Sequence, residues 1–154
     1  MKLLPTPNYL RSNLIQAIDF PVSLQAKHLA TMLLTKTSPE FRQEIGQALL
    51  DELSLSAGIE LAKLKVSATQ QYHKKSKGRI VFKQYGYYRP KTCYLYIQNQ
   101  TPVRRQDVAP KAFVDTLLHE WMHHYDHYKL RIHSLHTSGF YLRLRDLKEK
   151  LGLR

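Results

Sequence analysis

Histidines gather in one part of the chain, since six of the eight fall between residues 119 and 136. His119 and His123 are four residues apart, and Glu120 directly follows the first of them. On a helix this spacing puts both imidazoles on one face, about 6 Å apart at the backbone, where they could hold one cation. Glu120 projects sideways and could take a proton from a water that the cation activates. The pattern therefore predicts a zinc site with Glu120 as general base, as in zinc peptidases.

A catalytic zinc site needs a third protein ligand beside an open position. His127 lies about 12 Å from His119 along a helix axis, which is too far for one ion. His124 points about 100° away from His123. Asp126 could orient the imidazole of His123, or it could face solvent. None of these three residues is therefore expected to be the third ligand.

Two further histidines, His133 and His136, follow a predicted break in the helix, where the chain can fold back. His136 stands at the start of a final helix. Phe140 and Leu144 would pack this helix across the one that carries His119 and His123. We therefore favour His136 as the third ligand, with His133 in the looser connector as the alternative. Metzincins are excluded, because their glycine and third histidine would fall at Asp126 and Lys129.

The elements that must position these residues can be predicted from periodicity. Apolar residues recur at helical spacing over about residues 10–18, 24–32 and 41–53, so residues 1–60 are expected to form a helical N-terminal region. Ser38-Pro39-Glu40 has the composition of a helix start, and Gly58 marks the end of that helix. Helices are also expected from about Pro110 to Tyr128 and from Thr137 or Ser138 to Gly152.

Residues 61–100 follow the period of two that is typical of strands. β-Branched and aromatic residues alternate around 64–66, 80–82 and 93–97, which predicts three short antiparallel strands. The expected fold class is therefore α+β, with N-terminal helices, a small three-stranded sheet, a helix carrying the histidine pair and a C-terminal helix. Residues 61–154 would form the core, in one compact unit with residues 1–60.

The composition limits the class of protein and its partners. No apolar run is long enough to span a membrane, the N-terminus lacks a secretory signal, and Cys93 is the only cysteine, so a cytoplasmic protein is expected. Residues 1–60 carry 5 basic and 6 acidic side chains, whereas residues 61–118 carry 12 basic and 2 acidic ones. The basic residues 74–91 could bind DNA or another polyanion, or they could form a solvated face.

The segment from Thr116 to His124, followed by His136-Thr137-Ser138-Gly139-Phe140, resembles the SprT-like zinc metallopeptidase family. The strand pair Gly86–Pro90 and Tyr94–Ile97 is also similar to that family, and the resemblance covers about residues 64–150. It implies a zincin-type, gluzincin-like fold, Zn²⁺ bound by His119, His123 and His136, Glu120 as general base, and proteolysis of DNA-associated proteins. The chain departs from some members because no cysteine zinc ribbon follows.

Three hypotheses concern how such a site would treat its substrate. The strand Tyr94–Gln98 would form the sheet edge above the cleft, and a protein or peptide substrate would add to it as an extra strand. Tyr125 and Tyr141 are near enough in sequence to stabilise an oxyanion, although packing is the commoner role. Tyrosines between residues 85 and 96, interleaved with cations, could stack on nucleic-acid bases, although half-buried strands also favour tyrosine.

Two other functions fit the same residues. One is a catalytically idle zincin-fold module that binds nucleic acid, with the metal in a structural role. The presence of Glu120 argues against this, because a structural site needs no base. The other is a zinc hydrolase that acts on a non-peptide bond, since the same zinc and glutamate pair activates water for other electrophiles.

Overall fold

The structure, a computed structural model, describes residues 6–70, 72–76, 79–101 and 104–153, without the side chains of residues 69–84. Three helices form the N-terminal part: α1 (Pro7–Leu14), α2 (Leu24–Met32) and α3 (Pro39–Ala57). The predicted ends of α3 are confirmed, because Ser38 Oγ accepts a hydrogen bond from Phe41 N at 3.2 Å and Gly58 ends the helix with a φ of 71°. The first helix begins and ends earlier than the pattern over residues 10–18 predicts, because Ile15 has extended backbone angles.

The main sheet has the strand order β1 (Lys63–Gln70), β5 (Tyr94–Gln100) and β4 (Gly86–Arg89). β1 and β5 are parallel, whereas β4 and β5 are antiparallel. The prediction of three antiparallel strands was therefore wrong. The long crossover between β1 and β5 permits parallel pairing, and alternation alone does not identify a strand's partner.

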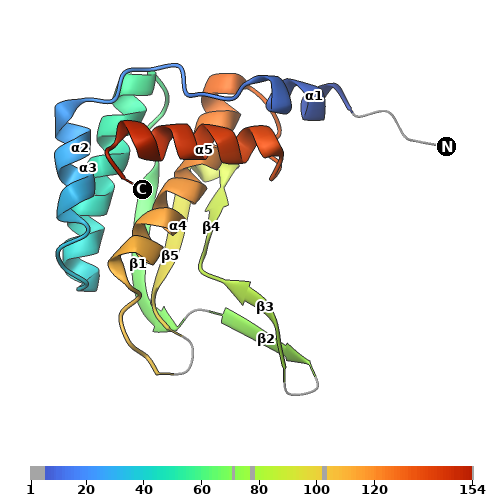
Figure 1. Ribbon diagram of the computed structural model, residues 1–154. Helices are drawn as coiled ribbons and strands as arrows, with labels where there is room; N and C mark the ends of the chain where they lie inside the picture. The colour runs from blue at the N-terminus through green and yellow to red at the C-terminus, as the bar shows by residue number, and fades with distance from the viewer. Residues whose placement is uncertain (1–5, 71, 77–78, 102–103, 154) are drawn as a thin grey trace.

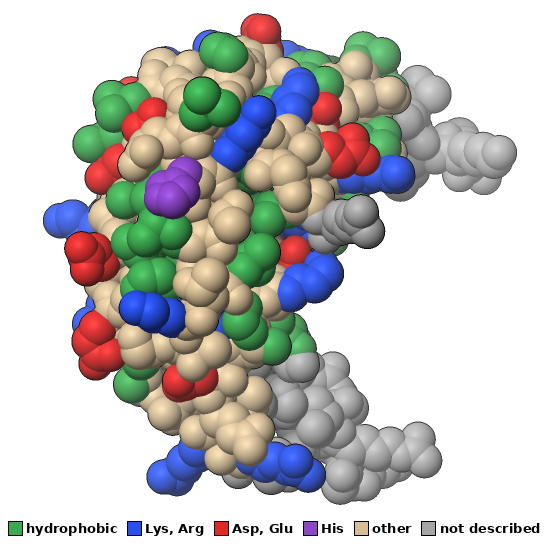
Figure 2. All heavy atoms as spheres, turned by 60° about the vertical axis from the view of Figure 1, so that its left-hand side comes forward, with side chains coloured by type: hydrophobic (Ala, Val, Ile, Leu, Met, Phe, Trp, Pro, Cys, Tyr) green, Lys and Arg blue, Asp and Glu red, His purple; other side chains and the backbone are tan. Residues whose placement is uncertain are grey.

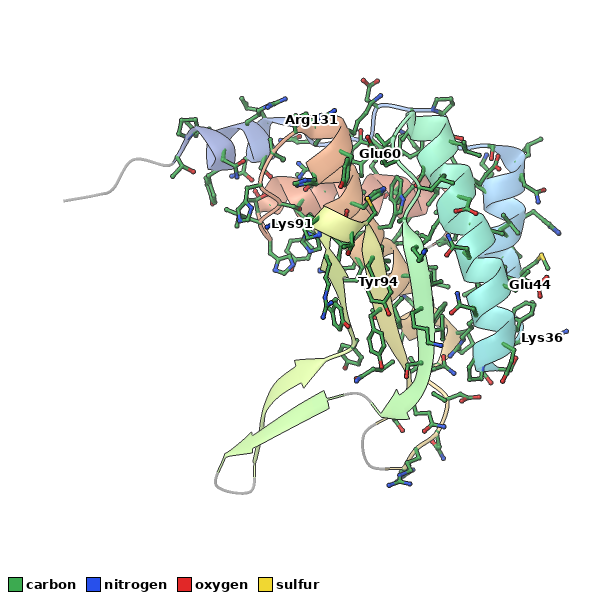
Figure 3. All side chains as sticks on the ribbon, turned by 180° about the vertical axis from the view of Figure 1, so that it is seen from behind. Lys36, Glu44, Glu60, Lys91, Tyr94 and Arg131 are labelled. Carbon is green, nitrogen blue, oxygen red and sulfur yellow. The ribbon has the colours of Figure 1, made fainter. Side chains whose placement is uncertain are left out.

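The prediction of the strand at the sheet edge was also wrong. β5 is the central strand, so Tyr94–Gln98 cannot form the edge. The alternation along β5 determines only the faces of the sheet, since Leu95 and Ile97 are buried against the helices and Tyr94 projects from the opposite face (Figure 3). The edge strand next to the histidine-bearing helix is β4. A separate hairpin of β2 (Tyr72–Ser76) and β3 (Arg79–Gln84) projects from the body (Figure 1).

The C-terminal part supplies α4 (Pro110–Tyr125), one π-helical turn η2 (Asp126–Leu130) and α5 (Ser138–Lys150). A short 3₁₀ turn, η1 (Pro90–Thr92), joins β4 to β5. The predicted α-helix to Tyr128 thus ends three residues early and widens into the π turn. Helices α3 and α4 pack on one face of the sheet, and α5 crosses α4 (Figure 1). The fold is α+β, with a small mixed sheet covered on one face by helices.

Buried apolar residues of α2 and α3 belong to the same core cluster as those of β5, α4 and α5. Trp121 lies within this core, where its indole N–H donates to Ser54 Oγ at 3.1 Å and its ring meets Phe20 edge-on at 5.9 Å. On the side of α2 and α3, Lys and Arg side chains are interspersed with Asp and Glu (Figure 2). Among the described residues, no helix is long and apolar enough to cross a membrane.

Candidate metal centre

His119 and His123 lie one turn apart on α4, and the other faces of this helix determine where the two imidazoles point. Phe113, Leu117 and Trp121 are buried in the core, and they fix the rotation of the helix about its axis. His119 and His123 are thereby directed toward the start of α5. The helical spacing in the sequence thus becomes a pair of rings whose centroids are 5.1 Å apart.

His136 completes a group of three. Its Nε2 lies 3.1 Å from His119 Nε2 and 3.0 Å from His123 Nε2. One N–H on His136 could donate to only one of these nitrogens at a time, so hydrogen bonding does not account for both approaches. In a tetrahedral zinc site, nitrogens at 2.0–2.1 Å from the ion would be about 3.3 Å apart. The three histidines could therefore bind one metal ion, and their donor set fits zinc.

Phe140 forms the floor under this group. Its ring is fully buried, stacks on His123 at 4.5 Å between centroids, and meets His119 edge-on at 5.1 Å. Thr137 caps α5, since its Oγ1 accepts from Phe140 N at 3.1 Å. This cap starts the helix directly after His136. The spacing of His136 and Phe140 therefore places the third histidine directly beside the ring that supports the group.

Burial keeps the two imidazoles on α4 in the neutral form. It lowers the pKa of His119 to about 4 and that of His123 to about 3, with smaller contributions from neighbouring histidines. Both rings are therefore neutral at neutral pH, which leaves a lone pair for a cation.

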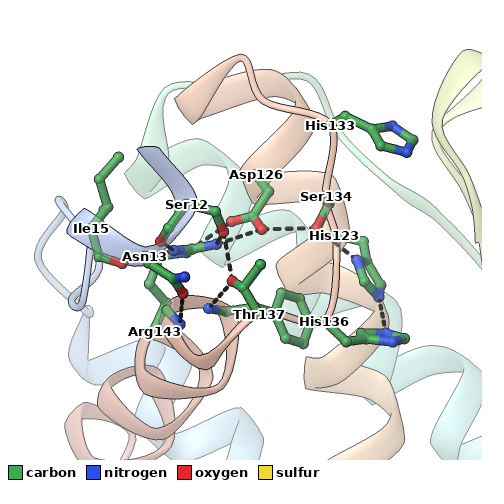
Figure 4. A network of polar contacts seen from close by, with 12 residues as sticks. Ser12, Asn13, Ile15, His123, Asp126, His133, Ser134, His136, Thr137 and Arg143 are labelled. Atoms are coloured by element: carbon green, nitrogen blue, oxygen red, sulfur yellow. Dashed lines mark hydrogen bonds and ion pairs between the residues drawn. The ribbon is translucent and has the colours of Figure 1, made fainter. Parts of the chain in front are cut away.

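A chain of polar contacts fixes the tautomer of His123 (Figure 4). Ser134 Oγ donates to Asp126 Oδ2 at 2.8 Å and lies 2.7 Å from His123 Nδ1. Because the serine proton is used on the carboxylate, His123 Nδ1–H must be the donor in the second contact. Its Nε2 then carries the lone pair and faces His136. Of the two roles considered for Asp126, the structure supports orientation of His123, and it places the carboxylate away from solvent.

Arg143 holds the carboxylate of Asp126 from the other side. Its Nε and Nη2 donate to the two carboxylate oxygens at 3.0 and 2.7 Å, and neither side chain is exposed to solvent. Burial raises the pKa of Asp126, and the arginine opposes that effect. Neither Ser134 nor Arg143 was identified from the sequence, because no spacing rule links residues 123, 126, 134 and 143.

Glu120 lies in a cleft of about 310 Å³ beside the histidines. One wall of the cleft is β4 and the following turn, with Gly86, Tyr88 and Pro90. Burial raises the pKa of Glu120 to about 7. A carboxylate with this pKa can both accept and return a proton near neutral pH.

The remaining histidines lie outside the cluster. His133 lines the cleft, but its ring is apart from those of His123 and His136 (Figure 4), and it is not in the metal-binding group found among the described residues. His127 also lines the cleft, because the π turn brings it there. His124 is buried on another face, where its Nε2–H donates to Glu60 O at 2.6 Å and its Nδ1 accepts from the Tyr88 hydroxyl at 2.6 Å.

The two tyrosines considered for the oxyanion have different positions. Tyr125 is fully buried, and its hydroxyl accepts from Asp19 N at 2.9 Å, so it is a packing residue. Tyr141 is half-exposed, and its ring centroid lies 6.0 Å from that of His136.

No protein-family model, curated protein or solved structure matched this chain. The resemblance to SprT-like metallopeptidases accordingly stays a prediction from the motif, and the functional argument depends on the geometry of the site.

Proposed function

We propose that this protein is a zinc-dependent endopeptidase. The observation that carries the proposal is the convergence of three histidines, in which the Nε2 atoms of His119 and His123 lie 3.1 and 3.0 Å from His136 Nε2, beside a partly buried glutamate in a cleft. His119, His123 and His136 would hold the ion. When bound, Zn²⁺ would activate a water molecule and polarise the scissile carbonyl. The remaining position of a four-coordinate site would be left for this chemistry.

Glu120 would act as the general base and then as the general acid. Its carboxylate would accept the proton of the attacking water and deliver it to the leaving amine. The position of Glu120 in the cleft beside the three histidines supports both steps. A purely structural metal site would have no use for a partly buried carboxylate at this place.

The edge strand β4 supports a peptide as substrate. Gln98 N donates to Tyr85 O at 3.1 Å, so the ladder alternation directs the backbone groups of Gly86 and Tyr88 away from β5. Both residues line the cleft. An extended peptide could add to this edge with its scissile bond near Glu120. This arrangement favours peptide hydrolysis over a non-peptide bond.

His133 is a second candidate group for catalysis. Its side chain lines the same cleft as Glu120, and it is not in the histidine cluster. Its backbone is fixed, since Asn8 Nδ2 donates to His133 O and His133 N donates to Asn8 Oδ1, both at 2.8 Å. These contacts keep residue 133 beside the cleft, where its imidazole could donate a hydrogen bond to the developing oxyanion.

Metal removal and restoration test the proposal. The protein would be treated with a chelator and dialysed, and then reloaded with one equivalent of Zn²⁺. Cleavage of unfolded casein would be followed by mass spectrometry, which identifies new peptide termini. We expect fragments only from the zinc-loaded protein. A protein that binds one zinc but produces no new termini from any unfolded substrate would contradict the peptidase function.

Nucleic-acid binding is a second candidate function, favoured by the face of the main sheet that none of the described helices covers (Figure 3). The side chains on or beside this face are Lys63, Lys65, Tyr87, Arg89, Tyr94 and Tyr96. Tyr87 stacks on Tyr96 at 5.1 Å, and the Arg89 guanidinium lies 5.2 Å from the Tyr87 ring. Most cations of the predicted patch at residues 74–91 belong to side chains outside the described part of the structure.

Such a face would suit a single-stranded polynucleotide, with stacking on tyrosine and phosphate contacts to cations. It would direct the peptidase to DNA-associated proteins. Binding of a single-stranded oligonucleotide should weaken steeply between 50 and 200 mM salt, and Tyr94→Ala should weaken it by about 1–3 kcal/mol. Absence of binding at 50 mM salt would rule out this second function and leave the first untouched.

A further inference from the structure

Helix α1 is held by polar contacts and not by apolar packing. Ser12 is its only buried residue, whereas Tyr9, Leu10 and Leu14 are 42, 49 and 82% exposed. Helices of eight residues are marginal in water on their own. The helix therefore depends on whatever its polar side chains contact.

Most of those contacts go to the segment that carries His136, and Ser12 Oγ also accepts from Arg143 Nη2 at 3.2 Å. Asn8 makes the paired backbone hydrogen bonds to His133 described above. Ser12 Oγ lies 2.7 Å from Thr137 Oγ1 inside the protein. Asn13 Oδ1 accepts from Ser138 Oγ and from Gly139 N, both at 2.9 Å. Three residues on α1 thus fix the backbone on both sides of the third histidine.

Arg143 links the same helix to the other side of the site. Its Nη1 donates to Ser12 O and to Ile15 O, the latter at 2.7 Å, which satisfies carbonyls at the end of α1. The rest of its guanidinium holds Asp126, which orients His123 through Ser134. The end of α1 is therefore connected to two metal ligands by separate routes (Figure 4).

Gly139 allows this close approach. A Cβ at this position would lie 2.0 Å from Ser12 O and 2.8 Å from Asn13 Cα, both of them backbone atoms that cannot rotate away. Any larger residue would push α1 off the first turn of α5. The glycine of the segment His136–Phe140 thus serves the contact with α1.

We propose that α1 is a clamp for the metal centre, and that its docking and metal binding stabilise each other although α1 contributes no ligand. The inference rests on the proposed metal site. Docking of α1 fixes the backbone around His136 and the orientation of His123, which lowers the entropy lost when an ion is bound. By linkage, a bound ion must stabilise the docked helix by the same free energy.

The test compares zinc affinity between the wild type and Asn8→Ala/Asn13→Ala, measured by competition with a chromogenic chelator. Outer partners of metal ligands typically contribute roughly 10- to 100-fold in affinity, and we expect a loss in that range. Arg11→Ala is the matched control, because Arg11 is an exposed residue on the same helix and its loss should leave the affinity unchanged. Gly139→Ala removes no polar side chain and should reproduce the loss.

Two further readouts separate this role from plain structural support. Visible absorption of the Co²⁺-loaded double variant should be weaker than that of the wild type. When His136 is misplaced, water molecules take its position and raise the coordination number of the ion, and Co²⁺ absorbs less strongly in sites of higher coordination number. Amide hydrogen exchange in residues 8–15 of the wild type should slow when Zn²⁺ is added, a measurement that needs no variant to fold. Wild-type protein that binds no zinc would refute the metal site itself. Wild-type protein that binds zinc, with unchanged variant affinity and unchanged exchange in α1, would refute the clamp alone.

Discussion

Asp126 and Arg143 form an ion pair in which both side chains are fully buried and two hydrogen bonds, of 2.7 and 3.0 Å, join them. The pair ends the polar chain that starts at His123. A buried carboxylate is costly without its cation, and removal of one partner of such a pair typically costs 3–5 kcal/mol.

Replacing the arginine should therefore destabilise the protein strongly. We expect Arg143→Met to lower the free energy of unfolding by about 3–5 kcal/mol in urea titrations. Arg145→Met is the matched control on the same helix. Its pair with Glu149 is mostly exposed, with 76 and 61% of the two side chains accessible, so solvent screening limits the loss to about 1 kcal/mol or less. An equal decrease in the free energy of unfolding of the two variants would show that the buried ion pair contributes no more to stability than the exposed one.

The assignment of the third ligand predicts a difference between two neighbouring histidines. His136→Ala should reduce bound zinc well below one equivalent after dialysis, because only two imidazoles remain. His133→Ala should keep one equivalent, since His133 lies outside the cluster. Elemental analysis of both dialysed proteins measures this. Full occupancy in His136→Ala together with metal loss in His133→Ala would reverse the assignment.

The role proposed for His133 in the cleft predicts a loss of rate without a loss of metal. His133→Ala should lower kcat by roughly 100-fold, the size found when one oxyanion donor is removed, while KM changes little. Steady-state kinetics on a fluorogenic peptide would separate the two parameters. His127→Ala serves as the comparison, because His127 lines the same cleft. An unchanged kcat in His133→Ala would remove this residue from the catalytic group.

The buried His124 predicts acid destabilisation of the metal-free protein. Burial lowers its pKa below the usual 6.5, so the folded state favours the neutral ring. A base with a lowered folded pKa stabilises fully above its unfolded pKa, and this stability is lost as the pH falls toward the folded pKa. His119, lowered to about 4, acts in the same direction. The urea concentration at the midpoint of unfolding should therefore decrease when the pH is lowered from 7 to 5.

The control for this pH dependence is the exposed His28 on α2. His28→Gln should leave the slope of stability against pH unchanged. His124→Gln removes one titrating ring and should make the slope shallower. A midpoint that rises on acidification would contradict the sign argued here.

Local chemistry explains which parts of the fold could be predicted. Ser38 and Gly58 mark the ends of α3 because capping and left-handed backbone depend on neighbours in sequence. The same applies to His119 and His123, whose convergence is a property of helical spacing. The sequence also favoured His136, because Thr137 and Ser138 have the composition of a helix start.

Long-range contacts explain what could not be predicted. The parallel pairing of β1 with β5 depends on how the intervening hairpin leaves the body, and alternation along each strand carries no information about that. The π turn after Tyr125 was not predicted, because the helical pattern in the sequence continues to Tyr128. Asn8 and His133 are 125 residues apart, so their paired hydrogen bonds have no signal in a single sequence.

The replacement Glu120→Gln tests the central claim most directly, because it removes the base while keeping the shape of the side chain. Zinc content and cleavage of unfolded casein would be measured on the same preparations of wild type and variant. A variant that retains one equivalent of zinc and loses all but a trace of the wild-type turnover is the expected result. Undiminished cleavage by a fully loaded variant would contradict the account.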